Sequence, residues 1–345
     1  MRPGIRSRPW AGIDVGSHSV KLVATMGSRH WIAEVANTVP EHERETPAGR
    51  QSLARLVADC ITSAGLSPRG FRGITMGISG ADVIIKQIAL PYMDEDEVGQ
   101  ALRFEARKHL PFDPQGMVID FQIVGRSITE KRMDVLLAAV SQERLDRLTA
   151  PLRLLGLDAD IVDATPLALT NALFHQVALK PETQMLLDLG HSASHLILHQ
   201  RSEPYFARRF EFGGRTITQA ISRGMKIPFE EAEAWKISLA RTSPSVDWSL
   251  PEMGFILEAL RYDLIEELKR SVAFYRTIGK LSEPFTLWLS GGAARLPGLS
   301  QRLEELLEAP VHVFDPMESM NGGRGNRELK SPQFAQALGL ALRNA

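Results

Sequence analysis

The feature that most constrains the fold is a short glycine hairpin that occurs twice in the chain. Each copy is an apolar strand that ends in Asp-x-Gly, turns through small polar residues and returns as a second apolar strand. The copies occupy residues 12–23 and 186–197, and Asp14 of the first corresponds to Asp188 of the second. They lie about half a chain length apart in a sequence of 345 residues. This spacing predicts two related lobes that each contain one hairpin.

The composition of the hairpins favours binding of a polyphosphate. Gly16 and Gly190 let the backbone approach an anion closely, and N–H groups in such a turn can point into one concavity. Hydroxyl groups that can add hydrogen-bond donors are present at Ser17, Ser19 and Ser192. The carboxylates of Asp14 and Asp188 can hold a hydrated Mg²⁺, which needs only one or two such ligands. A single Asp-x-Gly is usually only a turn, but two matched copies favour a clamp that grips phosphate from both sides.

A third glycine element follows a short apolar strand near residue 289. The segment 286–289 predicts a buried strand that runs into Ser290, Gly291 and Gly292, with a helix after Pro297. A turn without side chains can lie flat against a purine or a ribose. None of these elements is a Walker loop or a Gly-x-Gly-x-x-Gly fingerprint, so P-loop and Rossmann proteins are excluded.

Strand and helix patterns alternate along the whole chain, which predicts an α/β fold. The helix at 53–65 carries Cys60 on its apolar face, where a buried structural thiol is expected rather than a reactive one. Four acidic residues at 94–97 suit the positive end of a helix dipole better than a metal site. Glu233 and Lys236 are spaced as an i,i+3 ion pair on a helix.

Composition excludes several classes of protein. Lys plus Arg is 40 and Asp plus Glu is 41, which argues against a general nucleic-acid binder, since such a protein needs a clustered excess of basic residues. The balance does not exclude a local basic patch. A single cysteine excludes an internal disulfide and a cysteine metal cage. Histidine spacing typical of a zinc protease and the Gly-x-Ser-x-Gly elbow of a hydrolase are absent from the sequence. No apolar run is long enough to span a membrane, and a cytoplasmic protein is expected.

Two phosphate hairpins followed by a glycine turn, in this order, resemble the actin, sugar-kinase and Hsp70 superfamily. Within it the chain is similar to the PilM family of type IV pilus assembly proteins, which are related to the cell-division protein FtsA. Four stretches carry this closer match: residues 12–21, 104–112, 213–218 with 232–236, and 338–343. The resemblance extends from about residue 10 to residue 343.

The resemblance implies an actin-like (ribonuclease H-like) two-lobed ATPase fold with an FtsA-like inserted subdomain. The first lobe comprises 1–82 and 164–184, interrupted by the inserted subdomain at 83–163. The second lobe comprises a core at 185–215, a helical part at 216–284 and the core with the adenosine motif at 285–330. A closing helix at 331–345 completes the expected layout.

The resemblance also implies ATP with Mg²⁺ in the cleft between the lobes. The residues that it assigns to the nucleotide are Asp14, Gly16, Ser17, Ser19, Lys21, Asp188, Gly190, His191, Ser192, Gly214, Glu233, Lys236, Gly291 and Gly292, with Asp14 and Asp188 holding Mg²⁺ through water. Similar proteins carry small residues in the second hairpin, so His191 is expected either to point at phosphate or to fill its space. His195 is expected to be structural, and ATP hydrolysis is expected to be weak or absent.

The family further implies a partner, the N-terminal cytoplasmic peptide of the inner-membrane protein PilN. Phe104, Leu110, Pro111 and Phe112 are expected to offer apolar surface between the first lobe and the inserted subdomain, although ordinary core positions would explain them equally well. Membrane association would come through this partner, and a homo-oligomer is compatible with the sequence. The alternatives are a sugar kinase, a component of a type II secretion system, and an FtsA-like protein whose terminal amphipathic helix binds the membrane. The last is disfavoured because 331–345 is expected to close the fold.

Overall fold

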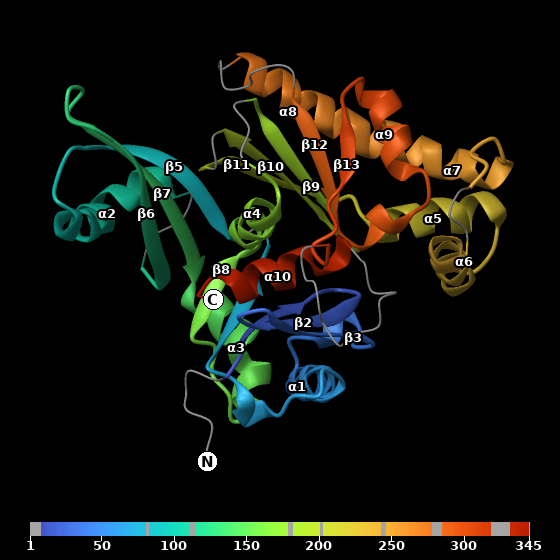
Figure 1. Cartoon of the computed structure of the whole chain (residues 1–345), viewed down its shortest axis with the longest axis horizontal. Coiled ribbons are helices and arrows are strands. Elements are labelled where there is room, and N and C mark those ends of the chain that lie inside the picture. The colour runs from blue at the N-terminus through green and yellow to red at the C-terminus, as the bar shows by residue number, and fades with distance from the viewer. Residues whose placement is uncertain are drawn as a thin grey trace.

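The computed structural model describes residues 8–80, 83–110, 115–178, 182–200, 203–242, 246–277, 285–318 and 332–344. Its described strands form two sheets of five strands and one sheet of three strands. Figure 1 shows the two larger sheets one above the other, with the small sheet at the side. Among the described helices, none is both long and apolar enough to cross a membrane.

The two five-stranded sheets have the same topology, which confirms the prediction of two related lobes. The first has the order β3-β2-β1-β4-β8 and the second the order β11-β10-β9-β12-β13. In each, three strands form an antiparallel meander and two further strands run parallel to its first strand. The first sheet comprises β1 (Trp10–Val15), β2 (Ser19–Met26), β3 (Arg29–Ala36), β4 (Gly73–Ile78) and β8 (Ile161–Ala164). The second comprises β9 (Gln184–Leu189), β10 (Ser194–Gln200), β11 (Glu203–Phe210), β12 (Thr286–Ser290) and β13 (Val311–Val313).

The strand registers of the two hairpins are equivalent as well. Asp14 is opposite Lys21 in the β1–β2 pair, and Asp188 is opposite His195 in the β9–β10 pair. The repeat in the sequence therefore places both aspartates at the same point of the two sheets, where the first strand enters its turn.

Helices cover the outer faces of both sheets and also fill the space between them. In the first lobe, α1 (Pro47–Ser63) and α3 (Gln142–Leu154) pack on the outer face through apolar residues such as Ile61 and Leu152. Cys60 is buried in this core, where desolvation raises its pKa to about 12, as expected of a structural thiol. The second lobe carries α5 (Gly214–Met225), α6 (Phe229–Thr242), α7 (Pro251–Ala259), α8 (Glu266–Thr277), α9 (Leu299–Leu307) and a π-helical turn, η4 (Leu260–Ile265).

Two helices lie between the sheets and join the lobes into one apolar core. They are α4 (Thr165–Gln176) and α10 (Ala335–Leu342), which Figure 1 shows at the centre of the molecule. Their side chains pack with Val23 of the first sheet and with Leu186 and Ile197 of the second. The short 3-10 turns η2 (Glu41–Glu43), η3 (Pro68–Gly70), η5 (Gly292–Arg295) and η6 (Pro332–Phe334) connect these elements.

The segment inserted between β4 and β8 forms its own small sheet with one helix. Its strands are β5 (Ile84–Pro91), β6 (Met117–Ser127) and β7 (Arg132–Ser141), in the antiparallel order β5-β7-β6, and α2 (Glu95–His109) accompanies them. A capping box between Asp94 and Glu97 begins α2, so the acidic run is a helix start, as the sequence predicts. Val98, Leu102 and Leu110 contribute to the core of this unit.

Candidate functional site

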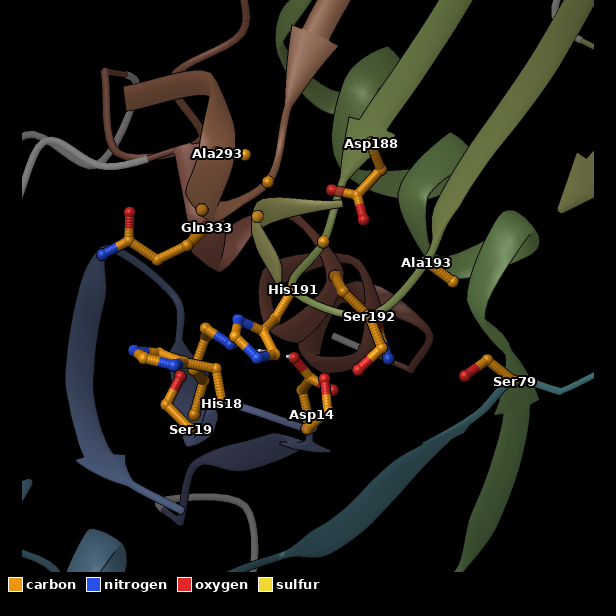
Figure 2. A pocket seen from close by; sticks show the side chains of 18 of the residues that line it. Asp14, His18, Ser19, Ser79, Asp188, His191, Ser192, Ala193, Ala293 and Gln333 are labelled. Atoms are coloured by element: carbon orange, nitrogen blue, oxygen red, sulfur yellow. Dashed lines mark hydrogen bonds and ion pairs between the residues drawn. The ribbon is translucent and has the colours of Figure 1, made fainter. Parts of the chain in front are cut away.

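A cavity of about 610 Å³ lies between the two hairpins. Every residue that the family resemblance assigns to the nucleotide lines it: Asp14, Gly16, Ser17, Ser19, Lys21, Asp188, Gly190, His191, Ser192, Gly214, Glu233, Lys236, Gly291 and Gly292. Figure 2 shows Asp14 and Asp188 entering this pocket from opposite sides, with His191 and Ser192 between them. The fold thus brings together the first hairpin, the second hairpin, residues of α5 and α6, and the glycine turn after β12, which are separate in the sequence.

Both hairpin turns are too tight for any residue but glycine at their first position. The Gly16 N–H donates to the Ser19 carbonyl at 3.0 Å, and a Cβ at position 16 would lie 2.9 Å from that same oxygen. In the second hairpin a Cβ at Gly190 would lie 2.6 Å from the carbonyl oxygen of Ala193. These close approaches explain why the repeat keeps glycine at the equivalent position of each turn.

The first hairpin presents a weakly paired carboxylate and a cation to the pocket. Lys21 Nζ lies 3.4 Å from Asp14 Oδ2, and both side chains are 12% exposed. The hydroxyl of Ser19, in contrast, donates to Glu34 Oε1 at 2.7 Å, and Gln333 Nε2 donates to Glu34 Oε2 at 3.1 Å. Ser19 therefore supports the hairpin through Glu34 in this conformation instead of pointing a free donor at a ligand.

The second hairpin presents a carboxylate that is costly to ionise. Desolvation raises the pKa of Asp188 to about 6, although Ser290 Oγ donates to its Oδ1 at 2.8 Å. At the position of Lys21 this hairpin has His195, which is 8% exposed and whose pKa burial lowers to about 4. A carboxylate without a cationic neighbour on its own hairpin is a suitable ligand for a metal ion, which would offset its desolvation.

Two histidines meet between the turns. The rings of His18 and His191 have their centroids 5.0 Å apart at an interplanar angle of 33°. Desolvation lowers the pKa of both imidazoles, that of His191 to about 4, so both are uncharged near neutral pH. His191 fills part of the space between the hairpins, which is one of the two positions expected for it.

The pair Glu233 and Lys236 belongs to a network that holds α6 against α5. Lys236 Nζ donates to the Gly214 carbonyl at 2.9 Å, to Thr218 Oγ1 at 2.7 Å and to Glu233 Oε2 at 2.8 Å. Burial alone would raise the pKa of Glu233, but Lys236 and Thr218 lower it further than burial raises it. Burial also lowers the pKa of Lys236. Glu233 and Lys236 thus form the predicted i,i+3 ion pair and line one side of the pocket, where their opposite charges neutralise one another.

The two glycines after β12 have different requirements. Gly291 has φ of +89°, and a Cβ there would lie 2.3 Å from the Leu189 carbonyl oxygen. Gly292 has open space where its Cβ would be. The first glycine is therefore demanded by the fold, while the second leaves a bare stretch of backbone facing the pocket.

Sequence reasoning missed several residues of the site, among them four that contact the hairpins or their supports. His18, Glu34, Ser290 and Gln333 line or support the pocket. A signal for His18 was present, because each copy of the repeat has one histidine in its turn. Glu34 and Gln333 gave none, since their contact joins residues 299 positions apart in the sequence.

The four residues expected to bind a partner do not all lie on the surface. Phe104 on α2 is 79% exposed, whereas Leu110 is 7% exposed and packs in the core of the inserted unit. Pro111 and Phe112 lie outside the described residues. Leu110 thus has the ordinary core position that was the alternative, and Phe104 alone remains as described apolar surface from this group.

Two lobes of identical topology, each with a glycine hairpin that opens into a shared cavity, define the class of actin-like ATPase folds. A sequence model of the type IV pilus assembly protein PilM family matches residues 12–345. The chain therefore belongs to the PilM family.

Solved structures and curated proteins also resemble this chain, over its whole length or over part of it. A structure described as a PilM-PilN type IV pilus biogenesis complex is similar over 96% of this chain and 97% of its own, with 26% identity and a TM-score of 0.79. The ethanolamine utilization protein EutJ from Carboxydothermus hydrogenoformans shares the fold at 16% identity, over 97% of this chain and 89% of its own, with a TM-score of 0.56. The cell division protein FtsA of Borreliella burgdorferi is 26% identical over 46% of this chain. The match spans only 42% of that FtsA.

Proposed function

We propose that this protein is a nucleotide-binding assembly component of the type IV pilus inner-membrane platform, and that it holds the N-terminal cytoplasmic peptide of a PilN-like partner. The observation that carries the nucleotide part is the pair of equivalent hairpins that face one cavity. The partner is supported by the similar structure described as a PilM-PilN complex.

The residues of the cavity fit MgATP in a defined orientation. Phosphates would lie between the turns at Gly16 and Gly190, where backbone N–H groups and the hydroxyl of Ser192 are available. Asp14 and Asp188 would hold a hydrated Mg²⁺, because they enter the pocket from opposite sides. The adenosine would lie against the bare backbone at Gly292, which offers no side chain to block it.

The pairing of the other acidic side chains favours nucleotide binding over rapid turnover. Glu34, Glu41 and Glu233 also line the cavity. Each is already engaged: Glu34 with Ser19 and Gln333, Glu41 with Arg215, and Glu233 with Lys236 and Thr218. A general base must be able to accept a proton from the attacking group. We therefore propose that the nucleotide acts by shifting the population of closed lobes, which changes the affinity for the partner.

The partner would dock beside α2 of the inserted unit. Phe104 is 79% exposed there, and an exposed aromatic side chain is typical of an anchor for an extended peptide. Phe274 on α8 of the second lobe is 54% exposed. It provides a matched control, because it is also an exposed phenylalanine but lies outside the inserted unit.

The proposal predicts that Phe104→Ala weakens binding of the PilN-like N-terminal peptide by at least ~10-fold, since truncating an aromatic anchor costs more than ~1.4 kcal/mol. Phe274→Ala should leave the affinity unchanged. Isothermal titration of the peptide into both variants with MgATP, with MgADP and without nucleotide measures both parts. Equal loss in the two variants would contradict the docking site, and equal peptide affinity in the three nucleotide states would contradict the coupling.

A further inference from the structure

Three side chains from three separate elements meet at one point between the lobes. They are His18 in the first hairpin turn, His191 in the second hairpin turn and Glu233 on α6. Each offers one ligand atom, and these atoms all lie within 4.8 Å of one another. We propose that His18, His191 and Glu233 form a site for one divalent d-block cation, such as Zn²⁺, that fastens the two lobes together.

The donor set determines the class of metal. Two imidazole nitrogens and one carboxylate oxygen suit Zn²⁺, Co²⁺ or Ni²⁺, whereas Mg²⁺ and Ca²⁺ take oxygen ligands. The site is therefore chemically distinct from the pair Asp14 and Asp188, which offers only carboxylates. Three protein ligands leave further coordination positions to water.

To bind a metal ion, the three ligand atoms would have to move only slightly closer to one another. Zinc bonds of about 2.0–2.2 Å place tetrahedral ligands roughly 3.4 Å apart, which is closer than the 4.8 Å that bounds the present separations. His18 can supply this movement, because it is exposed and lies in a turn. Its ring already lies beside that of His191, with centroids 5.0 Å apart.

Neighbouring groups orient the carboxylate of Glu233. Lys236 Nζ and Thr218 Oγ1 both bond to its Oε2, which leaves Oε1 as the ligand atom. Hydrogen bonds of this kind fix the direction of a metal ligand. The charge of Lys236 disfavours a cation nearby, but this lysine is bound to the same carboxylate and to two further oxygens.

The position of the site gives it a consequence for the nucleotide. Both histidines belong to the hairpins between which the phosphates are proposed to bind, so a bound cation would occupy the path of the phosphate chain. This consequence, unlike metal binding itself, rests on the proposed function. Zn²⁺ and MgATP should then exclude one another, with Zn²⁺ retaining the lobes in a nucleotide-free closed state.

Binding of Co²⁺ and Zn²⁺ to the whole purified protein tests the site directly. Titration with Co²⁺, followed by its visible absorption, should saturate at one ion per chain, and Zn²⁺ should displace it. Mg²⁺ should not. His18→Ala, His191→Ala and Glu233→Gln should each weaken binding by at least ~10-fold, whereas His42→Ala, at a side chain that is 82% exposed, should not change it. Circular dichroism and thermal melting of each variant identify any loss that comes from unfolding.

Retention of the wild-type affinity by a folded His18→Ala, His191→Ala double variant would overturn the proposal, as would absence of any one-to-one binding. A second titration, of MgATP into the Zn²⁺-loaded protein, separates the two proposals. Weakened ATP binding that His18→Ala restores supports the exclusion. Unchanged ATP binding in the Zn²⁺-loaded protein would overturn the exclusion. ATP that fails to bind even without Zn²⁺ would contradict the proposed function while the cation site stands on its own titration.

Discussion

Gly291 and Gly292 are adjacent in sequence, but only the first has a backbone conformation and surroundings that require glycine. Alanine at 291 would place a Cβ 2.3 Å from a carbonyl oxygen at φ of +89°, whereas alanine at 292 meets open space. Gly291→Ala should therefore lower the free energy of unfolding by at least ~2 kcal/mol. Gly292→Ala should melt like the wild type and bind ATP more weakly, because its methyl group faces the pocket.

Urea unfolding and ATP titration of both variants check this pair of expectations. Equal stability of the two variants would contradict the claim that the backbone at position 291 requires glycine. An unchanged ATP affinity in Gly292→Ala would contradict the placement of the adenosine.

His199 on β10 gives the fold a dependence on pH. Its side chain is 1% exposed, and neither ring nitrogen has a hydrogen-bond partner among the described residues. Burial lowers its pKa to about 3, against ~6.5 in an unfolded chain. Between these values the unfolded state binds the extra proton, so the free energy of unfolding falls as the pH drops below ~6.5.

His199→Leu should remove this loss and improve stability more at pH 5 than at pH 8, by about 2 kcal/mol. The same substitution at the exposed His42 should show no such difference. Urea unfolding at both pH values is the measurement, and an equal effect of the two substitutions would contradict an uncharged, buried His199.

For single residues, the sequence predicts which residue types form the site better than it predicts which other side chains they contact. The aspartates and glycines of the hairpins could be predicted because each lies at a fixed place in a repeated pattern, whereas Lys21, which His195 replaces in the second copy, was expected only from the family resemblance. The roles of Ser19 and Leu110 could not, since a hydroxyl that faces Glu34 and a leucine that closes a core depend on distant segments.

At the scale of elements, the backbone of α10 packs directly against its neighbours, which its apolar sequence alone does not predict. A Cβ at Gly339 would lie 1.7 Å from the Ala168 carbonyl oxygen of α4, and a Cβ at Gly12 of β1 would lie 2.2 Å from the Ala337 carbonyl oxygen. The helix is thus in backbone contact with α4 on one side and with the first sheet on the other. These backbone contacts fix α10 between α4 and the first sheet, while its side chains pack with Leu186 and Ile197 of the second sheet.

Gly339→Ala should consequently lower the free energy of unfolding by at least ~3 kcal/mol. Gly254→Ala on α7, where a Cβ meets nothing within 4 Å, should instead raise it by about 0.5–1 kcal/mol, because glycine is a poor helix former. Thermal and denaturant melts of the two variants compare the same substitution in two helices. Destabilisation of similar size in both would contradict the close packing of α10.

Element types were predictable because the alternation of apolar residues is a local property. The pairing of β12 between β9 and β13 was not, since residues 190–285 separate β12 from β9 in the sequence. The inserted unit was expected from the family resemblance, and its sheet order β5-β7-β6 required the structure.

At the scale of the whole molecule, the hairpin repeat in the sequence corresponds to two sheets with the same strand order. Two lobes with the same strand order face each other across a cavity, and α4 and α10 form the core between them. A ligand that contacts both hairpins would therefore bind both lobes at once, which is how a small molecule can set their relative position.

The central claim is that the two hairpins form a single nucleotide site. A crystal structure of the protein with a non-hydrolysable MgATP analogue tests it most directly. The account predicts phosphates between Gly16 and Gly190, with Mg²⁺ and its waters between Asp14 and Asp188, and with the adenosine against Gly292. A nucleotide bound elsewhere, or a cleft in which the rings of His18 and His191 still lie side by side between the turns at saturating nucleotide, would contradict it.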